Sequence, residues 1–284
     1  MSLPAMVLLA SCVSEPPILP VPAYFNELAG TGSPRDIRVA IGRGADVNGR
    51  GEEGMMPLMA AAAGNKSPEV IAVLLKAGAN VSGRDMYGRT PLMYAGGNRN
   101  PEIVTALLKA GADANDQDRN GWTALMLAVA DVGQSPEVIA RLLDAGADAN
   151  ARNQDGDTPL IAAARNPDPQ VIALLVHAGA DVNAHNAVGV TALMDAASVN
   201  VNLEVIKALL SAGADPNVRN LYDATALIYA VTNNPNPEVI TLLLEAGADA
   251  KAKDADLKMA LDYAQTDEKL KSTDAYGRLE AASK

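Results

Sequence analysis

A short glycine-led motif recurs along this chain of 284 residues at an almost constant spacing. Gly-Ala-Asp-x-Asn or a close variant begins at Gly44, Gly78, Gly111, Gly146, Gly179, Gly213 and Gly247, so the intervals are 33 to 35 residues. A second motif of the type Thr-Pro-Leu stays in phase with it, starting at Met56, Thr90, Thr123, Thr158, Thr191 and Thr225. Self-similarity at a fixed period of this size predicts a solenoid built from stacked supersecondary units.

A third recurring element, typified by Ser67-Pro68-Glu69 and Asn100-Pro101-Glu102, reads as a helix start. The first residue can accept hydrogen bonds from free backbone N–H groups, proline suits the first helical position, and the acid complements the helix dipole. An apolar stripe follows, for example Val70, Ile71 and Leu74, and ends at a glycine that supplies a left-handed cap. The repeating unit is therefore predicted to be two helices and a turn.

These residues resemble the ankyrin-repeat family. Its T-P-L-H-x-A signature appears as Thr90-Pro91-Leu92-Met93-Tyr94-Ala95, and its loop appears as Gly179-Ala180-Asp181-Val182-Asn183. The resemblance covers roughly residues 23 to 265 and implies an all-α solenoid of about eight helix-turn-helix units, with short hairpin loops and capping terminal repeats. The family's His is replaced throughout by apolar residues, so apolar packing must replace its hydrogen bonds: Met59, Met93, Met126, Ile161, Met194 and Ile228.

We assign residues 1–22 to a signal or lipobox remnant with a proline-rich tether, and residues 23–284 to the repeat domain. The units are expected near 23–48, 49–82, 83–115, 116–150, 151–183, 184–217 and 218–251, with a C-terminal cap over 252–284. The first unit has Asp36 where the next has Val70, which is expected of a cap whose outer side faces water.

The N-terminal segment carries the single cysteine. Leu9-Ala10-Ser11-Cys12 resembles the lipobox of bacterial lipoproteins, which implies lipidation of Cys12 and a place in the periplasm or at the outer membrane. The residues before it lack the Lys or Arg of a secretory signal, so an ordinary Cys12 in the tail of a cytoplasmic protein remains an alternative. One cysteine excludes an intramolecular disulfide.

The net charge and the absence of complete catalytic motifs argue against several classes of function. A net charge of −11 argues against nucleic acid and anionic lipid surfaces. The only histidines are His177 and His185, so a nucleophile has few bases to activate it. The run Gly49–Gly54 fits G-x-G-x-x-G only in a hairpin context, and the calcium-loop match from Asp116 has Leu127 where a glutamate is required. We expect no enzyme activity, no cofactor and no metal.

The family resemblance implies binding through the hairpin tips and the concave side formed by the first helix of each repeat. We predict a ridge centred on Trp122 that contacts a partner protein, because Trp, Tyr and Arg dominate interface energetics. Its residues are Met86, Tyr87, Arg89, Arg119, Trp122, Val188, Val190, Leu221 and Tyr222. Two alternatives stay open: each aromatic side chain shields its own hairpin, or the protein is an envelope receptor for a small molecule or peptide. A capped solenoid is expected to be a monomer.

Overall fold

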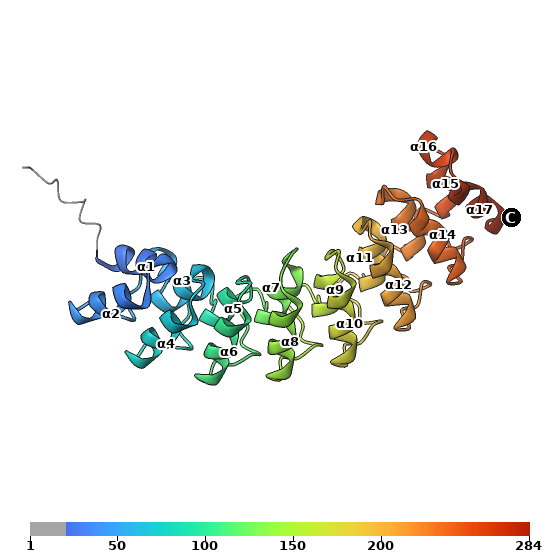
Figure 1. The fold of residues 1–284 in the computed structure, drawn as a ribbon. Coiled ribbons are helices and arrows are strands. Elements are labelled where there is room, and N and C mark those ends of the chain that lie inside the picture. Colours follow the sequence, from blue (N-terminus) through green and yellow to red (C-terminus); the bar gives the residue numbers. More distant parts are fainter. Residues whose placement is uncertain (1–20) are drawn as a thin grey trace, which may run out of the picture.

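The computed structural model describes residues 21–284, so Cys12 and the lipidation predicted for it lie outside the described residues. Within this range the chain forms consecutive helix pairs, and Figure 1 shows them stacked along an arc, with one row of helices on the concave side and the other on the convex side. The inner helices are α1 (Val21–Thr31), α3 (Pro57–Gly64), α5 (Pro91–Ala95), α7 (Ala124–Ala130), α9 (Pro159–Ala163), α11 (Ala192–Val199), α13 (Ala226–Asn233) and α15 (Ala260–Ala264). The outer helices are α2 (Pro34–Gly42), α4 (Pro68–Lys76), α6 (Pro101–Lys109), α8 (Pro136–Asp144), α10 (Pro169–His177), α12 (Leu203–Ser211), α14 (Glu238–Glu245) and α17 (Asp274–Ala282).

Each unit packs its inner helix against the inner helices of its neighbours, and its outer helix against theirs. No strand forms in the described part of the chain beyond two isolated antiparallel bridges, His185 with Thr191 and Lys253 with Met259. The all-α solenoid of about eight units predicted from the repeat is confirmed.

The predicted helix ends are formed by the residues that the motifs supply. In the inner row, the Thr123 hydroxyl accepts a hydrogen bond from the backbone N–H of Met126 and caps α7. In the outer row, Asn100 Oδ1 accepts from the N–H of Glu102 at the start of α6. The repeat glycines, Gly78 and Gly111 among them, have φ near +90°, where a Cβ is disfavoured. The short motifs therefore determine where each helix begins and ends.

The core is built from small and aliphatic side chains. Alanines such as Ala61 and Ala62 let the inner helices approach closely, and the apolar stripe of each interior outer helix, such as Val70, Ile71 and Leu74, is fully buried. The residues that replace the family's histidine are all buried too: Met59, Met93, Met126, Ile161, Met194 and Ile228. Apolar packing at this position is confirmed.

The segment between the inner and outer helix of a unit, here called the connector, carries a buried amide. In the sixth unit Asn200 Nδ2 donates to the carbonyls of Ala164 and Asn166, both at 2.9 Å and both in the preceding unit. Equivalent bonds to the preceding unit are made by Asn65, Asn98, Asn166 and Asn234. The longest repeat interval, Gly111 to Gly146, places an extra residue in the connector before Gln134, whose longer side chain reaches Gly96 instead.

The two ends depart from the interior units. Ser33 and Asp36 form a reciprocal capping box at the start of α2, so the polar Asp36 serves the helix end rather than the core. The hydrogen bond from Ser33 lowers the pKa of the Asp36 carboxyl. At the other end a short extra helix, α16 (Glu268–Lys271), precedes α17, and Leu270 and Leu279 are buried there. Both ends thus carry polar residues where interior units are apolar, although Tyr24 and Val39 stay exposed on the first unit.

Candidate functional site

The hairpins between successive units form a continuous edge. Each tip donates one backbone hydrogen bond to the tip before it, for example from the N–H of Arg119 to the carbonyl of Tyr87 at 2.9 Å, and from Leu221 to Val188 at 3.0 Å. The series runs from Glu53 to Ala255 through six such bonds. Since these bonds use only the backbone, they fix the spacing of the tips and leave their side chains unconstrained.

In every hairpin after the first, an Asp or Asn that is buried or partly buried gives the tip its shape. Asp85 Oδ1 accepts from the N–H groups of Tyr87 and Arg89, both at 2.8 Å. Asn186 does the same for Val188 and Val190. Asx side chains that bond to the backbone ahead of them stabilise such turns.

A tyrosine on the inner helix pins three of these hairpins. Its hydroxyl bonds to the shaping residue of the hairpin, at 2.7 Å between Tyr94 and Asp85. Burial raises the pKa of Tyr94 to about 12, and the Asp85 carboxylate adds to the shift. The other two pairs are Tyr229 with Asn220 and Tyr263 with Asp254. The hairpins are therefore rigid platforms for whatever their tips carry.

The structure separates the predicted site residues into two sets. The tips themselves expose Met86, Tyr87, Val188, Leu221 and Tyr222, and Arg119 is exposed beside them. The Tyr87 hydroxyl donates to Glu53 Oε1 at 2.9 Å, which raises the pKa of Tyr87. Arg89 lies behind this tip, with its guanidinium 5.7 Å from the centre of the Tyr87 ring.

Trp122 and Val190 lie off the tip edge, partly buried in the corner between the hairpins and the inner helices. The structure therefore does not place Trp122 and Val190 on one edge with the exposed tips, and the partner-binding role of the predicted ridge stays a prediction. Both side chains line a hollow of about 480 Å³ on the concave side, which Tyr229 also lines.

An ion pair lies within this concave hollow. Arg165, just after α9, makes two hydrogen bonds of 3.0 Å to the Asp195 carboxylate on α11, and this pairing raises the pKa of Arg165. Asp157 lies in the same hollow, where it accepts from Asn186 Nδ2 at 2.9 Å. The hollow thus combines an aromatic wall with charged groups of both signs.

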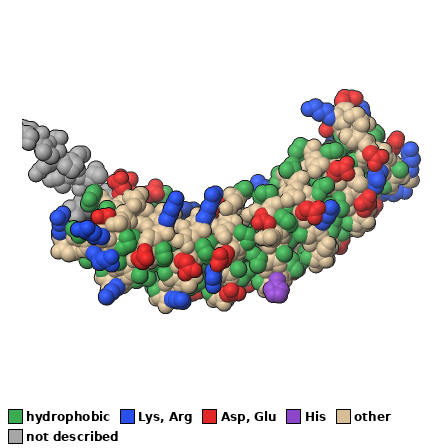
Figure 2. All heavy atoms as spheres, in the orientation of Figure 1, with side chains coloured by type: hydrophobic (Ala, Val, Ile, Leu, Met, Phe, Trp, Pro, Cys, Tyr) green, Lys and Arg blue, Asp and Glu red, His purple; other side chains and the backbone are tan. Residues whose placement is uncertain are grey.

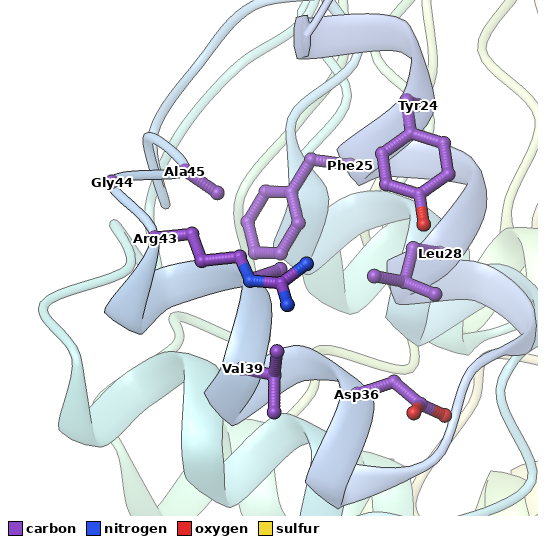
Figure 3. Close-up of a pocket in the computed structure, with 9 residues that line it drawn as sticks. Tyr24, Phe25, Leu28, Asp36, Val39, Arg43, Gly44 and Ala45 are labelled. Atoms are coloured by element: carbon purple, nitrogen blue, oxygen red, sulfur yellow. The ribbon is translucent and has the colours of Figure 1, made fainter. Parts of the chain in front are cut away.

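A second hollow, of about 370 Å³, opens on the outer face of the first unit. In Figure 3 the Tyr24, Phe25 and Leu28 side chains of α1 face the Arg43 guanidinium across it. This is the face that interior units cover with a preceding unit, so it is the open end of the stack rather than an enclosed site.

One exposed residue on the hairpin edge escaped prediction. Leu257, in the last hairpin, is 74 % exposed and has φ of +63°. Five earlier hairpins have glycine at that place, from Gly54 to Gly189, and aligning the hairpins on the repeat would have shown that leucine replaces it. Three exposed valines, Val132, Val199 and Val201, lie near the connectors, away from the hairpin edge.

The segments that matched catalytic or metal motifs have structural roles. Glu52–Gly54 is a single 3₁₀ turn, η1, with no strand before it. Asp116 pairs with Arg84 of the preceding hairpin, and Asp118 bonds to the backbone of its own turn. In the part of the chain that the structure describes, no group of three His, Cys, Asp or Glu side chains is placed to hold a metal ion.

Comparison with known families gives one match. A family model described as Ankyrin repeats (3 copies) matches residues 27–118, 95–186, 125–220 and 164–254, which overlap to cover most of the chain. A search of curated proteins found no match.

Proposed function

The chain belongs to the ankyrin-repeat family, and from that premise we propose that it is a noncatalytic scaffold that binds a partner protein through its hairpin tips and its concave helix face. Ankyrin repeats in general act in protein–protein interaction, and a solenoid of this kind presents an extended surface for it. The partner's identity and the effect of binding are open to experiment.

The observation that carries the proposal is the contrast between a fully packed interior and an exposed row of large apolar tips. Met86, Tyr87, Leu221 and Tyr222 are exposed while the stripes of the outer helices between the two end units are buried. Scattered apolar residues are ordinary on a surface, but these lie on one rigid, hydrogen-bonded edge. The concave hollow beside Trp122 extends the same surface toward the inner helices.

The hollow also favours the second candidate function, a receptor for a peptide or small molecule. Trp122, Tyr229 and the Arg165–Asp195 pair would hold a ligand that has both an apolar and a charged part. A ligand that binds there raises the melting temperature increasingly as its concentration exceeds Kd. A shift abolished by Trp122→Ala would favour the receptor, and its absence across a peptide and metabolite panel would count against it.

Lipidation of Cys12 and an envelope location form a separate part of the proposal, and they rest on the lipobox resemblance alone. In residues 21–284, no helix has the length and apolar character needed to span a membrane. Labelling the source cell with a fatty-acid analogue tests the idea: the wild-type protein should carry label in the envelope fraction, and Cys12→Ser should carry none.

Affinity capture from the envelope fraction of the source cell tests the scaffold proposal. The intact protein is compared with the variant Tyr87→Ala, Trp122→Ala, Tyr222→Ala by quantitative mass spectrometry. A partner bound by the intact protein and lost by the variant supports both the role and the surface. The matched control is Val132→Ser with Val201→Ser, two exposed apolar residues away from the hairpin edge, which should retain the partner.

If the intact protein, the triple variant and the valine control bind the partner equally, the scaffold proposal stands, but the binding site lies elsewhere on the protein. Absence of any partner from both envelope and soluble fractions contradicts the scaffold proposal. Gel filtration of each variant tests the expected monomer at the same time.

A further inference from the structure

The inner-helix residue that pins a hairpin is a tyrosine in three units and an alanine in the fifth. In the third, seventh and eighth units the tyrosine follows the shaping residue by nine positions and bonds to it: Tyr94 with Asp85, Tyr229 with Asn220, and Tyr263 with Asp254. Nine positions after the shaping residue Asn153, the fifth unit has Ala162. The fifth hairpin therefore lacks the side chain that pins these three.

The amide of Asn153 keeps a buried donor without an acceptor. Asn153 is 6 % exposed, and its Oδ1 accepts from the N–H of Asp157 at 2.8 Å. Its Nδ2 has no hydrogen-bond partner among the described residues, whereas the same atom of Asn220 donates to the Tyr229 hydroxyl at 2.9 Å. A buried donor without an acceptor costs free energy, and a ligand that supplies the acceptor recovers it.

The second acceptor that a shaping asparagine can use is missing too. Asn186 Nδ2 donates to Asp157 Oδ1, and Asp157 is the fifth residue of the preceding hairpin. For Asn153 the corresponding residue is Trp122, whose indole N–H is a donor only. In the described part of the chain, Asn153 is thus the only shaping asparagine whose Nδ2 lacks an acceptor.

The missing tyrosine leaves room on the concave side. Ala162 lines the concave hollow of about 480 Å³, together with Trp122 and Tyr229, so the hollow includes the place that Tyr94 fills in its own unit. A hollow of this size can hold an aromatic side chain. Positive and negative side chains are interspersed along the face of the arc drawn in Figure 2, so shape and hydrogen bonding, rather than charge, select the ligand.

We propose that the concave hollow binds a tyrosine side chain supplied by the partner protein. The inference rests on the proposed binding of a partner through the concave face, and it names the residue that the partner contributes. The phenol ring packs beside Ala162, and its hydroxyl accepts from Asn153 Nδ2 as the Tyr229 hydroxyl accepts from Asn220 Nδ2. Tyrosine combines a large apolar ring with one polar group, and it is a frequent anchor at protein interfaces.

Trp122 takes part in this binding and can report it. Because Asn153 Nδ2 is buried, a wall of the hollow has to move before a hydroxyl reaches it. Trp122 occupies the hairpin position from which Asp157 contacts Asn186 Nδ2, so it is the side chain that we expect to move. It is also the only tryptophan of the chain, and its fluorescence therefore reports on the hollow alone.

The test uses the full-length protein and three probes: N-acetyl-tyrosinamide, N-acetyl-phenylalaninamide and N-acetyl-leucinamide. Trp122 is excited at the long-wavelength edge of its absorption, where none of the probes absorbs. The tyrosine probe should change the fluorescence saturably, with a Kd of ~1 to 10 mM. The phenylalanine probe should bind ~5-fold or more weakly, because Asn153 Nδ2 stays unpaired, and the leucine probe more weakly still.

Two substitutions at Ala162 separate the filling of the hollow from the hydrogen bond. Ala162→Tyr places the chain's own tyrosine there, so it should abolish binding of the tyrosine probe and raise the melting temperature by ~2 °C or more. Ala162→Leu, which copies Leu127 of the fourth unit, should also block the probe. It should raise the melting temperature less than half as much, since it leaves Asn153 Nδ2 without an acceptor.

The matched control is Ala60→Tyr. Ala60 has the equivalent place in the second unit and is also partly buried, but the hairpin there begins with Gly51 instead of an asparagine. This variant leaves the concave hollow intact, so it should bind the tyrosine probe within about twofold of the wild type.

Four results would overturn the inference: no saturable response to the tyrosine probe, equal binding of the tyrosine and phenylalanine probes, a response that Ala162→Tyr leaves unchanged, or an Ala162→Tyr protein no more stable than Ala162→Leu. The scaffold proposal fails separately, because its capture experiment depends on the native partner. A protein that captures a partner but does not bind the tyrosine probe keeps the scaffold and removes the tyrosine site. Probe binding without any captured partner supports the tyrosine site and removes the scaffold.

Discussion

The two edges of this solenoid follow opposite rules. On the connector edge, an amide at the same place in successive units is buried and donates to two carbonyls of the preceding unit, as Asn200 does. On the hairpin edge, one backbone hydrogen bond joins each pair of successive tips, and side-chain bonds such as that from Tyr87 to Glu53 are added only at some of them. The first tip residue changes freely, from Met86 to Arg119, Gln154, Ala187 and Leu221. Both edges link unit to unit, but only the connector edge does so mainly through the same kind of side chain in successive units.

The difference shows at which positions a repeat can change its side chain without losing stability. A buried carbonyl left without a donor destabilises the fold, so the connector side chain has to be an amide of the right length. A tip side chain meets solvent, and its replacement leaves the ladder of backbone bonds intact. Function can therefore be placed on the hairpin edge while the connector edge holds the stack together.

Removing a connector amide should have the largest effect. Asn200→Ala loses two hydrogen bonds to the preceding unit and leaves the carbonyls of Ala164 and Asn166 without that donor, so we expect a loss of about 2 to 4 kcal/mol in unfolding free energy. Urea unfolding followed by circular dichroism measures it. The control Asn120→Ala, at an exposed tip, should change stability by less than about 0.5 kcal/mol. Equal losses for the two variants would contradict the contrast between the edges.

An intermediate effect is expected at the loop after each outer helix. Asn183 Nδ2 donates to the Gly213 carbonyl and its Oδ1 accepts from the N–H of Asp215, whereas the second unit has Ser82 at this place. Asn183→Ser should cost about 1 kcal/mol, since the bonds are exposed to water. The reverse change, Ser82→Asn, should raise the stability, by about 0.5 kcal/mol. A Ser82→Asn protein no more stable than the wild type would show that Arg84 already compensates at that junction through its bonds to the third hairpin.

A smaller change of opposite sign is expected at Leu257. Relief of the left-handed strain, about 1 to 2 kcal/mol, is partly offset by the entropy of a new glycine, so Leu257→Gly should stabilise the protein by about 0.5 kcal/mol. Leu221→Gly is the control, because Leu221 does not have a positive φ and its replacement should destabilise slightly. Differential scanning calorimetry compares the two. Stabilisation by both, or by neither, would remove strain as the explanation.

The smallest change is confined to alkaline solution. Tyr94 keeps its proton to a pKa of about 12 in the folded protein, against an ordinary tyrosine pKa of 10.0, so the folded state binds more protons between these pH values. Its contribution to stability is complete below the ordinary pKa and is lost as the pH rises through the folded one. Tyr94→Phe should therefore flatten the fall in melting temperature over that range, and Tyr222→Phe, at an exposed tip, should not. Parallel falls for wild type and Tyr94→Phe would refute this role for the tyrosine.

Much of this architecture was predictable because the motifs act locally. Thr123 caps its own helix, Gly78 ends its own helix, and Asp85 shapes its own turn, so each signal lies within a few residues of its effect. The connector amides were missed, although Asn98 and Asn200 recur two residues before the outer helix N-cap. Their partners lie more than 30 residues away, and nothing local marks them as buried.

The candidate site divides in the same way. Sequence reasoning found Tyr87, Leu221 and Tyr222 as tip residues, since hairpin position follows from the repeat. It placed Trp122 on the same ridge, and the structure turns that side chain into the concave hollow. It did not single out Leu257, whose exposure depends on the terminal position of its hairpin.

By itself, the sequence determined the unit, its helix boundaries, the number of units and the apolar stripe, because these depend on caps, periodicity and turn residues within one repeat. Only the tertiary structure decided which side chains meet across units. The Asn200 amide and the Arg165–Asp195 pair each combine residues from different repeats. Their geometry follows from how one unit stacks on the next, and that stacking is a property of the packed solenoid rather than of any one segment.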